Sequence, residues 1–467
     1  MAGAFQGKAM RTNSLAGVFL FLAILAGASA RAQEQEQELA FRASVSGTYS
    51  DNAARTATAP IPATALDGLV GLQLTHNSPT LYVDGDFSEL QRWYAQGRLP
   101  NETIPSGSLD LIARPVPEVF SWTVTDTLGQ ISSDPFAALF AGNRQSVNVL
   151  STGPDVRVPL DSRDHVDISG RYGLDNFGDS ILDDQRYSGQ VDLAHDVGEG
   201  SQVGLVYAYQ QAEFHKATHP SEQIERAYAQ YRVAGARSYL VLEAGVDQLH
   251  QAASGRDRVS HVLLLLQRHL TDRVTFEGSY LHGYADSVQA FVSASRDGFT
   301  AGSDQNVQAL AVPYEASTGY LILTRTQGRL LAAVEVTASH EDYSLDPTVD
   351  RNTVGSYVSA DYALSPRLTL NLRAGYYETK FPYTQEDDRW VDGSLGLGRK
   401  LGRSLQLSLQ VSHLKGTSNT LTGQIVENRA VLTLSYTPGA QRLQRVYDPN
   451  APFRFFDRAP PAPQTPH

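Results

Sequence analysis

Three histidines of this chain stand beside or near a serine, the pairing on which serine hydrolases depend. The pairs are His282 with Ser279, His340 with Ser339, and His413 with Ser412. A nucleophilic serine needs its histidine within hydrogen-bond reach on the same face of the protein. Adjacent residues of an extended strand point to opposite faces, and a spacing of three has the same effect. The sequence therefore predicts no catalytic residue and no enzyme, and a lipid hydrolase is the least favoured function.

The sequence also contains no recognisable motif for a metal ion or a cofactor. The chain has no cysteine, which excludes metal–thiolate sites and disulfide bonds. The acidic stretches LDDQ and SLDPTVD offer oxygen ligands without the spacing of a calcium-binding EF-hand loop. No phosphate-binding glycine loop with its lysine is present. We therefore predict neither a metal site nor a cofactor.

A second set of reactive groups consists of charged residues inside apolar, strand-like runs. They are Glu243, Asp247, Glu277, Arg325, Glu335, Asp361 and Arg373. What these groups can do depends on which face of a strand carries them.

The runs that hold these charges alternate with a period of two residues. In RLTLNLRAGYYETKF, Leu368, Leu370 and Leu372 alternate with Thr369 and Asn371, which is the pattern of a β-strand. The pattern recurs along the chain, and no convincing helix interrupts it. The predicted strands, about 20 in number, are 39–51, 67–77, 80–95, 107–114, 118–128, 145–158, 164–175, 186–197, 201–213, 223–234, 237–249, 258–270, 273–286, 313–326, 328–342, 353–364, 367–381, 388–400, 403–415 and 427–437.

The connections between the predicted strands alternate in length. Tight turns such as LTDR, TQGR and LSPR separate some strands, while long polar segments such as QGRLPNETIPSG and residues 287–312 separate the others. Tight turns at one end and long loops at the other are typical of a transmembrane antiparallel up-and-down β-barrel. We expect roughly 18–20 strands, an even count that places both termini in the periplasm. The alternative is a soluble sandwich or propeller, but the strands are long, no blade motif repeats, and 22 tyrosines suit interfacial girdles.

In such a barrel the seven charged residues would line the lumen. An arginine on the lipid face near the midplane costs roughly 2–4 kcal/mol, which favours the inward orientation. A solvated or mutually paired interior is the simpler role for them. A ligand-binding role stays open.

Both ends of the chain differ from the strands. Lys8 and Arg11 precede an apolar run and small residues, the pattern of a secretory signal peptide, with cleavage after Ala32. We therefore predict a signal peptide at 1–32, a barrel at 33–438 and a Pro-rich periplasmic tail at 439–467. Export without cysteine points to the outer membrane of a Gram-negative cell. The net charge of −12 makes nucleic acid an unsuitable partner.

The last predicted strand carries the expected assembly signal. Leu432, Leu434 and Tyr436 would face lipid, and the chain continues past them instead of ending on a terminal aromatic residue. We expect the barrel-assembly machinery to read this internal strand.

One stretch, residues 120–154, combines unusual polar residues with strand formers. It contains Trp122, Asp126, Gln130, Asp134-Pro135, Asn143, Arg144, Asn148 and Thr152-Gly153-Pro154. FSWTVTDT predicts a strand, residues 129–144 a loop, and QSVNVLSTGPDVRV the returning strand. The order of these residues resembles the hallmark of outer-membrane proteins associated with the exosortase/PEP-CTERM protein-sorting system, which belong to a group of barrels found with exopolysaccharide loci.

The resemblance extends over the mature chain to Tyr436 and is specific only within residues 120–154. It implies an outer-membrane barrel made alongside surface-polysaccharide machinery, and it transfers no catalytic residue. We expect Trp122 to anchor at the membrane interface and the 129–144 loop to fold over or into the barrel. Ligand binding by Asp126, Asn143 and Arg144 is the open alternative.

Two functions follow from this resemblance and from the pattern of strands. The first is a porin-like conduit associated with exopolysaccharide export or with surface sorting of PEP-CTERM proteins. The second is a non-conducting surface scaffold that retains polysaccharide or sorted proteins through its extracellular loops. The expected partners are outer-membrane lipid and lipopolysaccharide, the barrel-assembly machinery, and exopolysaccharide or its periplasmic export apparatus.

Overall fold

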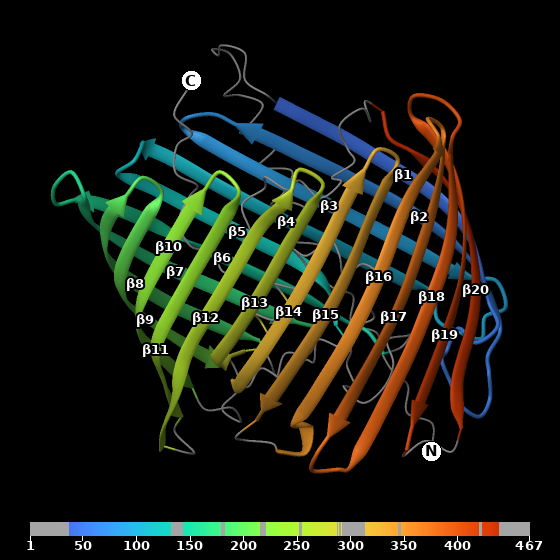
Figure 1. The fold of residues 1–467 in the computed structure, drawn as a ribbon. Helices are drawn as coiled ribbons and strands as arrows, with labels where there is room; N and C mark the ends of the chain where they lie inside the picture. The colour runs from blue at the N-terminus through green and yellow to red at the C-terminus, as the bar shows by residue number, and fades with distance from the viewer. Residues whose placement is uncertain are drawn as a thin grey trace.

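The chain forms a closed antiparallel barrel of 20 strands (Figure 1). The computed structural model describes residues 37–131, 143–178, 183–214, 221–251, 255–286, 288, 291, 313–343, 347–419 and 423–438. Each strand pairs with its neighbours in sequence, and β1 closes the barrel against β20, from Ala43 opposite Tyr436 to Ser50 opposite Arg429. The predicted fold class is confirmed.

The strands are β1 (Gln37–Ser50), β2 (Ala63–Asn77), β3 (Leu81–Tyr94), β4 (Glu102–Val116), β5 (Phe120–Ile131), β6 (Gln145–Pro159), β7 (Asp164–Phe177), β8 (Asp184–Gly198), β9 (Ser201–Phe214), β10 (Glu222–Gly235), β11 (Ser238–Gln251), β12 (Gly255–Thr271), β13 (Val274–Ala285), β14 (Tyr314–Gln327), β15 (Leu330–Asp342), β16 (Arg351–Ser365), β17 (Leu368–Phe381), β18 (Glu386–Lys400), β19 (Leu405–Ser418) and β20 (Gln424–Tyr436). A short 3₁₀ turn, η1 (Pro347–Val349), precedes β16. Among the described residues, no helix is long and apolar enough to cross a membrane.

Along each strand, alternate residues face the outside and the interior of the barrel. On β17–β20, Leu372, Leu395, Leu409 and Leu432 point outward and are 48, 47, 48 and 51% exposed. The residues next to them on each strand, such as Arg373 after Leu372, point into the barrel. Closure leaves no unpaired strand edge, so the backbone donors and acceptors of every strand are satisfied by its neighbours.

The connections at the two ends of the barrel differ in length, as predicted. The turn from β14 to β15 needs only Gly328 and Arg329, and Gly328 takes a positive φ of 56° that favours glycine. In the turn from β6 to β7, Asp161 accepts backbone N–H bonds from Arg163 and Asp164 at 2.7 and 2.8 Å, which hold the pKa of its carboxyl group below the usual value. At the opposite end, the chain between β13 and β14 runs from residue 286 to residue 313.

Among the strands that begin earlier than the sequence pattern predicts, β4 and β2 show the largest shifts. β4 starts at Glu102 instead of residue 107, although Pro105 lacks a donor and Gly107 has no side chain. β3 holds this part of the strand, because Glu89 pairs with Pro105 and Phe87 with Gly107. β2 starts at Ala63 instead of residue 67 and is likewise set by its pairing with Ser50 of β1. Pairing with a neighbour overrides weak strand propensity at both places.

The predicted signal peptide and the tail at 439–467 lie outside the described residues.

Candidate functional site

The inner wall of the barrel is a candidate functional surface because it carries a dense set of charged side chains. At β1–β4 they pair with one another. Arg42 donates to Asp86 at 2.8 Å, and Arg92 donates to Asp67 at 2.8 Å. These ion pairs join β1 to β3 across β2, and β2 to β3, and hold this part of the wall in place.

A more compact charged cluster surrounds Arg186 on β8. Asp175 of β7 lies beside its guanidinium, Asp184 lies at 3.0 Å, and Asp286 lies at 2.6 Å. Asp175 and Asp184 are 3 and 0% exposed, and Asp286 is 4% exposed. Glu222 at the start of β10 is also buried and accepts a bond from Gln251 at 3.1 Å. One arginine therefore balances three buried carboxylates that come from two strands and one connecting segment.

Asp286 belongs to a segment that leaves the wall and enters the barrel. At the end of β13, the backbone N–H of Tyr284 donates to Asp247 at 3.0 Å, while Arg226 donates to the Tyr284 carbonyl at 2.8 Å. These bonds turn the chain inward before Asp286 reaches Arg186 and Gln210, which lie on β8 and β9.

Beyond Asp286, the segment contacts a third part of the wall. Val288 and Phe291 are 5 and 3% exposed and pack with apolar inner-face residues of β5–β7. These residues are Ile131, Val147, Val149 and Phe177. Since β13 and β5–β7 are separated by several strands, the described residues Asp286, Val288 and Phe291 connect two distant parts of the inner wall.

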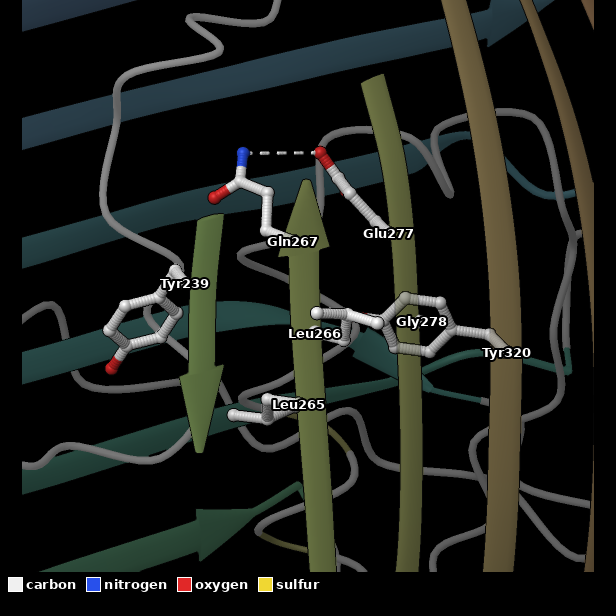
Figure 2. Close-up of a pocket in the computed structure, with 7 residues that line it drawn as sticks. All are labelled: Tyr239, Leu265, Leu266, Gln267, Glu277, Gly278 and Tyr320. Carbon is white, nitrogen blue, oxygen red and sulfur yellow. Dashed lines mark hydrogen bonds between the residues drawn. The ribbon is translucent and has the colours of Figure 1, made fainter. Parts of the chain in front are cut away.

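Several residues predicted to line the lumen lie on this inner face. Glu243 and Asp247 of β11 are 4 and 0% exposed and contact the two ring nitrogens of His261, each at 3.1 Å. Glu277 of β13 accepts a bond from Gln267 of β12 at 3.5 Å, and Figure 2 shows the two side chains meeting between their strands. The space in Figure 2 lies between strands β11–β14 and is too small to be a passage.

The remaining predicted lumen residues share the inner face with an aromatic platform. Glu335, Asp361 and Arg373 occupy inner positions of β15, β16 and β17, and Asp361 accepts a bond from Asn371 at 2.6 Å. On the same face, Tyr377 of β17 and Trp390 of β18 stack with ring centroids 6.2 Å apart and an interplanar angle of 16°. Sequence reasoning missed this platform because its two rings come from different strands.

Arg325 is a correction to the predicted lumen. It shares a face with Leu321 and Leu323, which are 54 and 45% exposed, so it points outward. Its guanidinium bonds to Gln327 near the tight-turn end of β14. A long arginine side chain at the edge of the lipid band reaches water, so the cost that favoured an inward position does not apply there.

The residues of the 120–154 stretch do not converge on one site. Trp122, Asp126 and Gln130 share the outer face of β5, and Asn148 shares the outer face of β6. Arg144 instead reaches Glu102 at 3.4 Å, and Asn143 is buried. The 129–144 loop mostly lies outside the described residues, which omit 132–142.

Close packing of β6 against β7 explains why residue 153 is a glycine. A Cβ atom there would lie 2.0 Å from the carbonyl oxygen of Gly170 on β7, so only glycine permits this approach of β6 to β7. Arg171 then donates to the carbonyl of Pro154 at 2.9 Å.

The histidines near serines form no predicted pair. His282, His340 and His413 point outward near the long-loop end, whereas Ser279, Ser339 and Ser412 point inward. The sequence did not reveal Ser317, whose hydroxyl lies 2.8 Å from His282 Nδ1 across the β13–β14 pair.

Ser317 does not complete a catalytic triad. Glu315 lies 3.8 Å from His282, too far for a hydrogen bond. His340 and His413 make comparable cross-strand contacts, with Asn352 at 2.7 Å and Asn428 at 2.8 Å, and neither contact includes a serine. We interpret these groups as a polar belt at the membrane interface. The residues that the structure describes hold no group of three metal-ligating side chains.

The predicted assembly residues lie on the outer face of the closing strand. Leu432, Leu434 and Tyr436 are 51, 45 and 44% exposed. Leu434 pairs with Val45 of β1 and with Leu407 of β19, so it stands at the seam where the barrel closes.

Comparison with known proteins gives one family match. Residues 355–437, from β16 to β20, match the family described as "Putative beta-barrel porin 2". No curated protein sequence matches the chain.

Solved structures resemble the chain at low identity. The copper transporter OprC is 11% identical with a TM-score of 0.44, over 87% of this chain and 81% of that chain. The FrpB iron transporter from Neisseria meningitidis is 8% identical with a TM-score of 0.45, over 85% and 82%. OccD1 (OprD) is 11% identical with a TM-score of 0.36, over 87% and 97%. Closure, strand alternation and the apolar outer face make this chain a porin-like β-barrel of the outer-membrane type.

Proposed function

We propose that this chain is a porin-like conduit of the outer membrane that passes polysaccharide chains or their fragments, in association with exopolysaccharide export or PEP-CTERM surface sorting. The observation that carries the proposal is the contrast between the two faces of one closed wall. The outer face is aliphatic, and the inner face holds paired charges and aromatic rings. Barrels of 16–18 strands already leave an aqueous channel, so a 20-stranded wall is wide enough for a polymer.

The stacked pair Tyr377 and Trp390 supports a sugar as cargo. A pyranose ring presents a face of C–H groups that packs on an aromatic face, while its hydroxyls donate to carboxylates. The inward carboxylates of Glu335 and Asp361 lie elsewhere on the same inner face, on β15 and β16. The same wall therefore offers stacking and hydrogen bonding to a passing chain.

The unequal ends of the barrel support its orientation. Tight turns belong to the periplasmic side of outer-membrane barrels and long loops to the outside. β1 begins and β20 ends at the tight-turn end. We therefore place both termini, the cleaved signal peptide and the 439–467 tail on the periplasmic side.

Substitution in the aromatic platform of Tyr377 and Trp390 tests whether the cargo is a sugar. In planar bilayers, the wild-type protein should give stepwise conductance that oligosaccharides of the cell's own surface polymer block. Trp390→Ala should weaken this block by about two- to tenfold, since stacking of a single ring is worth roughly 0.5–1.5 kcal/mol. The matched control is Tyr376→Ala, which removes the neighbouring tyrosine from the outer face, where its side chain is 39% exposed. Equal block of both variants would contradict the sugar assignment.

The alternative of a non-conducting scaffold is favoured by one observation, the apolar clamp of Val288 and Phe291 inside the barrel. These two residues occupy part of the lumen beside β5–β7. Release of the segment therefore separates the two functions.

We expect Val288→Asp with Phe291→Asp to raise single-channel conductance severalfold, because two carboxylates cannot stay among Ile131, Val147 and Phe177 without a hydrogen-bond partner. The apolar control, Val288→Ile with Phe291→Leu, should conduct as the wild type does. Absence of conductance from both variants in bilayers would favour the scaffold.

A further inference from the structure

We propose that the conduit is selective for positive charge, and that Asp388 and Asp392 of β18 give it a preference for sugar chains that bear cationic amino groups. The proposal rests on the proposed function, because it names the class of polymer that the lumen would pass. It is carried by the charges of the inner wall and by their positions around the platform of Tyr377 and Trp390.

Two carboxylates flank the aromatic platform along β18. Asp388, Trp390 and Asp392 occupy alternate positions of the strand, and all three share the inner face. Residues two apart on a strand lie about 6–7 Å from each other on one face. A sugar ring packed on Trp390 therefore lies within reach of a carboxylate on either side.

Glycines on the neighbouring strands make room for this arrangement. A Cβ atom at residue 375 of β17 would collide with Oδ1 of Asp392, so that carboxylate lies over the backbone of Gly375. A Cβ atom at residue 416 of β19 would collide with the indole of Trp390, so the indole lies over Gly416. At both positions only glycine leaves space for these side chains where they lie.

Carboxylates also outnumber guanidinium groups around Tyr357 of β16. Glu335 and Asp361 interact electrostatically with this tyrosine, and so do Asp392 and Arg373. All four charged side chains are half-buried on the inner face, so their charges reach the lumen. Three carboxylates and one guanidinium leave this part of the wall with a net negative charge.

The rest of the inner wall does not offset that charge. The inward faces of β11–β15 hold Glu243, Glu277 and Glu335, and their described residues include no inward lysine or arginine. Many arginines of the other strands are neutralised by carboxylates, as in the pairs Arg42–Asp86, Arg157–Asp167 and Arg171–Asp155. A paired arginine adds no net positive charge to the lumen.

A lumen of this charge favours cations over anions. Inward carboxylates attract positive solutes and repel negative ones, which is how acidic side chains make pores selective for cations. An ammonium group is also attracted to the face of a tryptophan or tyrosine ring. A sugar chain with cationic amino groups can therefore stack on Trp390 and pair with Asp388 or Asp392, whereas a uronate chain brings carboxylates against carboxylates.

The reversal potential in planar bilayers under a KCl gradient measures the charge preference. The wild-type protein should pass K⁺ severalfold more readily than Cl⁻. Asp388→Asn with Asp392→Asn should lower this preference, because the amides keep the shape and remove two negative charges. The matched control is Glu378→Gln with Asp387→Asn, which removes two carboxylates of the same strands from the outer face and should keep the wild-type preference.

Three oligosaccharides of equal length test the class of cargo through their block of the K⁺ current. Glucosamine oligosaccharides methylated to quaternary ammonium, whose charge is fixed, should block about tenfold more tightly than N-acetylglucosamine oligosaccharides. Galacturonate oligosaccharides should block least. In the double asparagine variant the advantage of the cationic oligosaccharide should shrink, while block by the neutral one should stay as in the wild type.

Equal block by the cationic and anionic oligosaccharides would overturn the proposal, and so would a preference for Cl⁻ or an unchanged preference in the double asparagine variant. If that variant does not assemble, Asp392→Asn alone and the three oligosaccharides on the wild type decide the outcome. Conductance without charge preference removes this inference and leaves the conduit standing. Absence of conductance from both the wild type and the variant with Val288→Asp and Phe291→Asp removes the conduit itself, and this inference with it.

Discussion

Replacing Leu434 and Tyr436 together with aspartate should leave no folded barrel in the outer membrane. Both side chains point outward on β20, and their strand pairs with β1 to close the wall. Two carboxylates on this face would have to enter lipid at the seam. An unclosed seam leaves backbone donors and acceptors without partners in hydrocarbon, at several kcal/mol each.

The measurement is the heat-dependent shift in gel mobility of outer-membrane fractions, together with resistance to protease. Ser435→Asp is the matched control, because residue 435 lies between the two test positions and points inward. It should assemble. Deletion of residues 439–467 should also leave a heat-modifiable barrel, and loss of the barrel on that deletion alone would show that the assembly signal lies in the tail.

The strands could be predicted from the sequence because apolar and polar residues alternate along each of them. Alternation along a run such as LTLNLRAGYY depends only on local residues, and tight turns set the pairing of neighbours. Leu432 and Leu434 fell on the correct face for this reason. The early starts of β2 and β4 were not predicted, because small residues and Pro105 weaken the alternation there.

The inward orientation predicted for Arg325 was wrong, although the sequence contains the signal. The alternation around Arg325 puts it on the face of the outward residue Leu323. The rule that charges face the lumen overrode that pattern. The alternation around Asp126 likewise puts that residue on the outward face of Trp122.

Contacts between distant strands could not be read from the sequence at all. The hydroxyl of Ser317 meets His282 across a strand pair, and Phe291 meets Val147 across the interior. Such contacts depend on register and on the path of a connecting segment. Local periodicity encodes neither.

Replacing Arg186 with methionine should cause the largest loss of stability available inside this barrel. The guanidinium is the shared partner of Asp175, Asp184 and Asp286, all of which are buried. Removing one partner of a buried ion pair typically costs about 3–5 kcal/mol, because the other charge stays without compensation. Methionine preserves much of the volume, so the charge loss dominates the effect.

Unfolding of the purified protein by urea in detergent micelles measures this loss, and Arg157→Met supplies the control. Arg157 pairs with Asp167 at 2.7 Å on the same inner wall, but its side chain is 44% exposed, and pairs of that kind are worth about 0–1 kcal/mol. Adding Asp175→Asn, Asp184→Asn and Asp286→Asn to the Arg186→Met variant should restore most of the stability, since the three side chains that share the guanidinium are then neutral. Equal losses in the Arg186 and Arg157 variants would mean that water reaches the cluster. The segment that carries Asp286 would then be held by Val288 and Phe291 alone, and charge would have no part in holding it across the lumen.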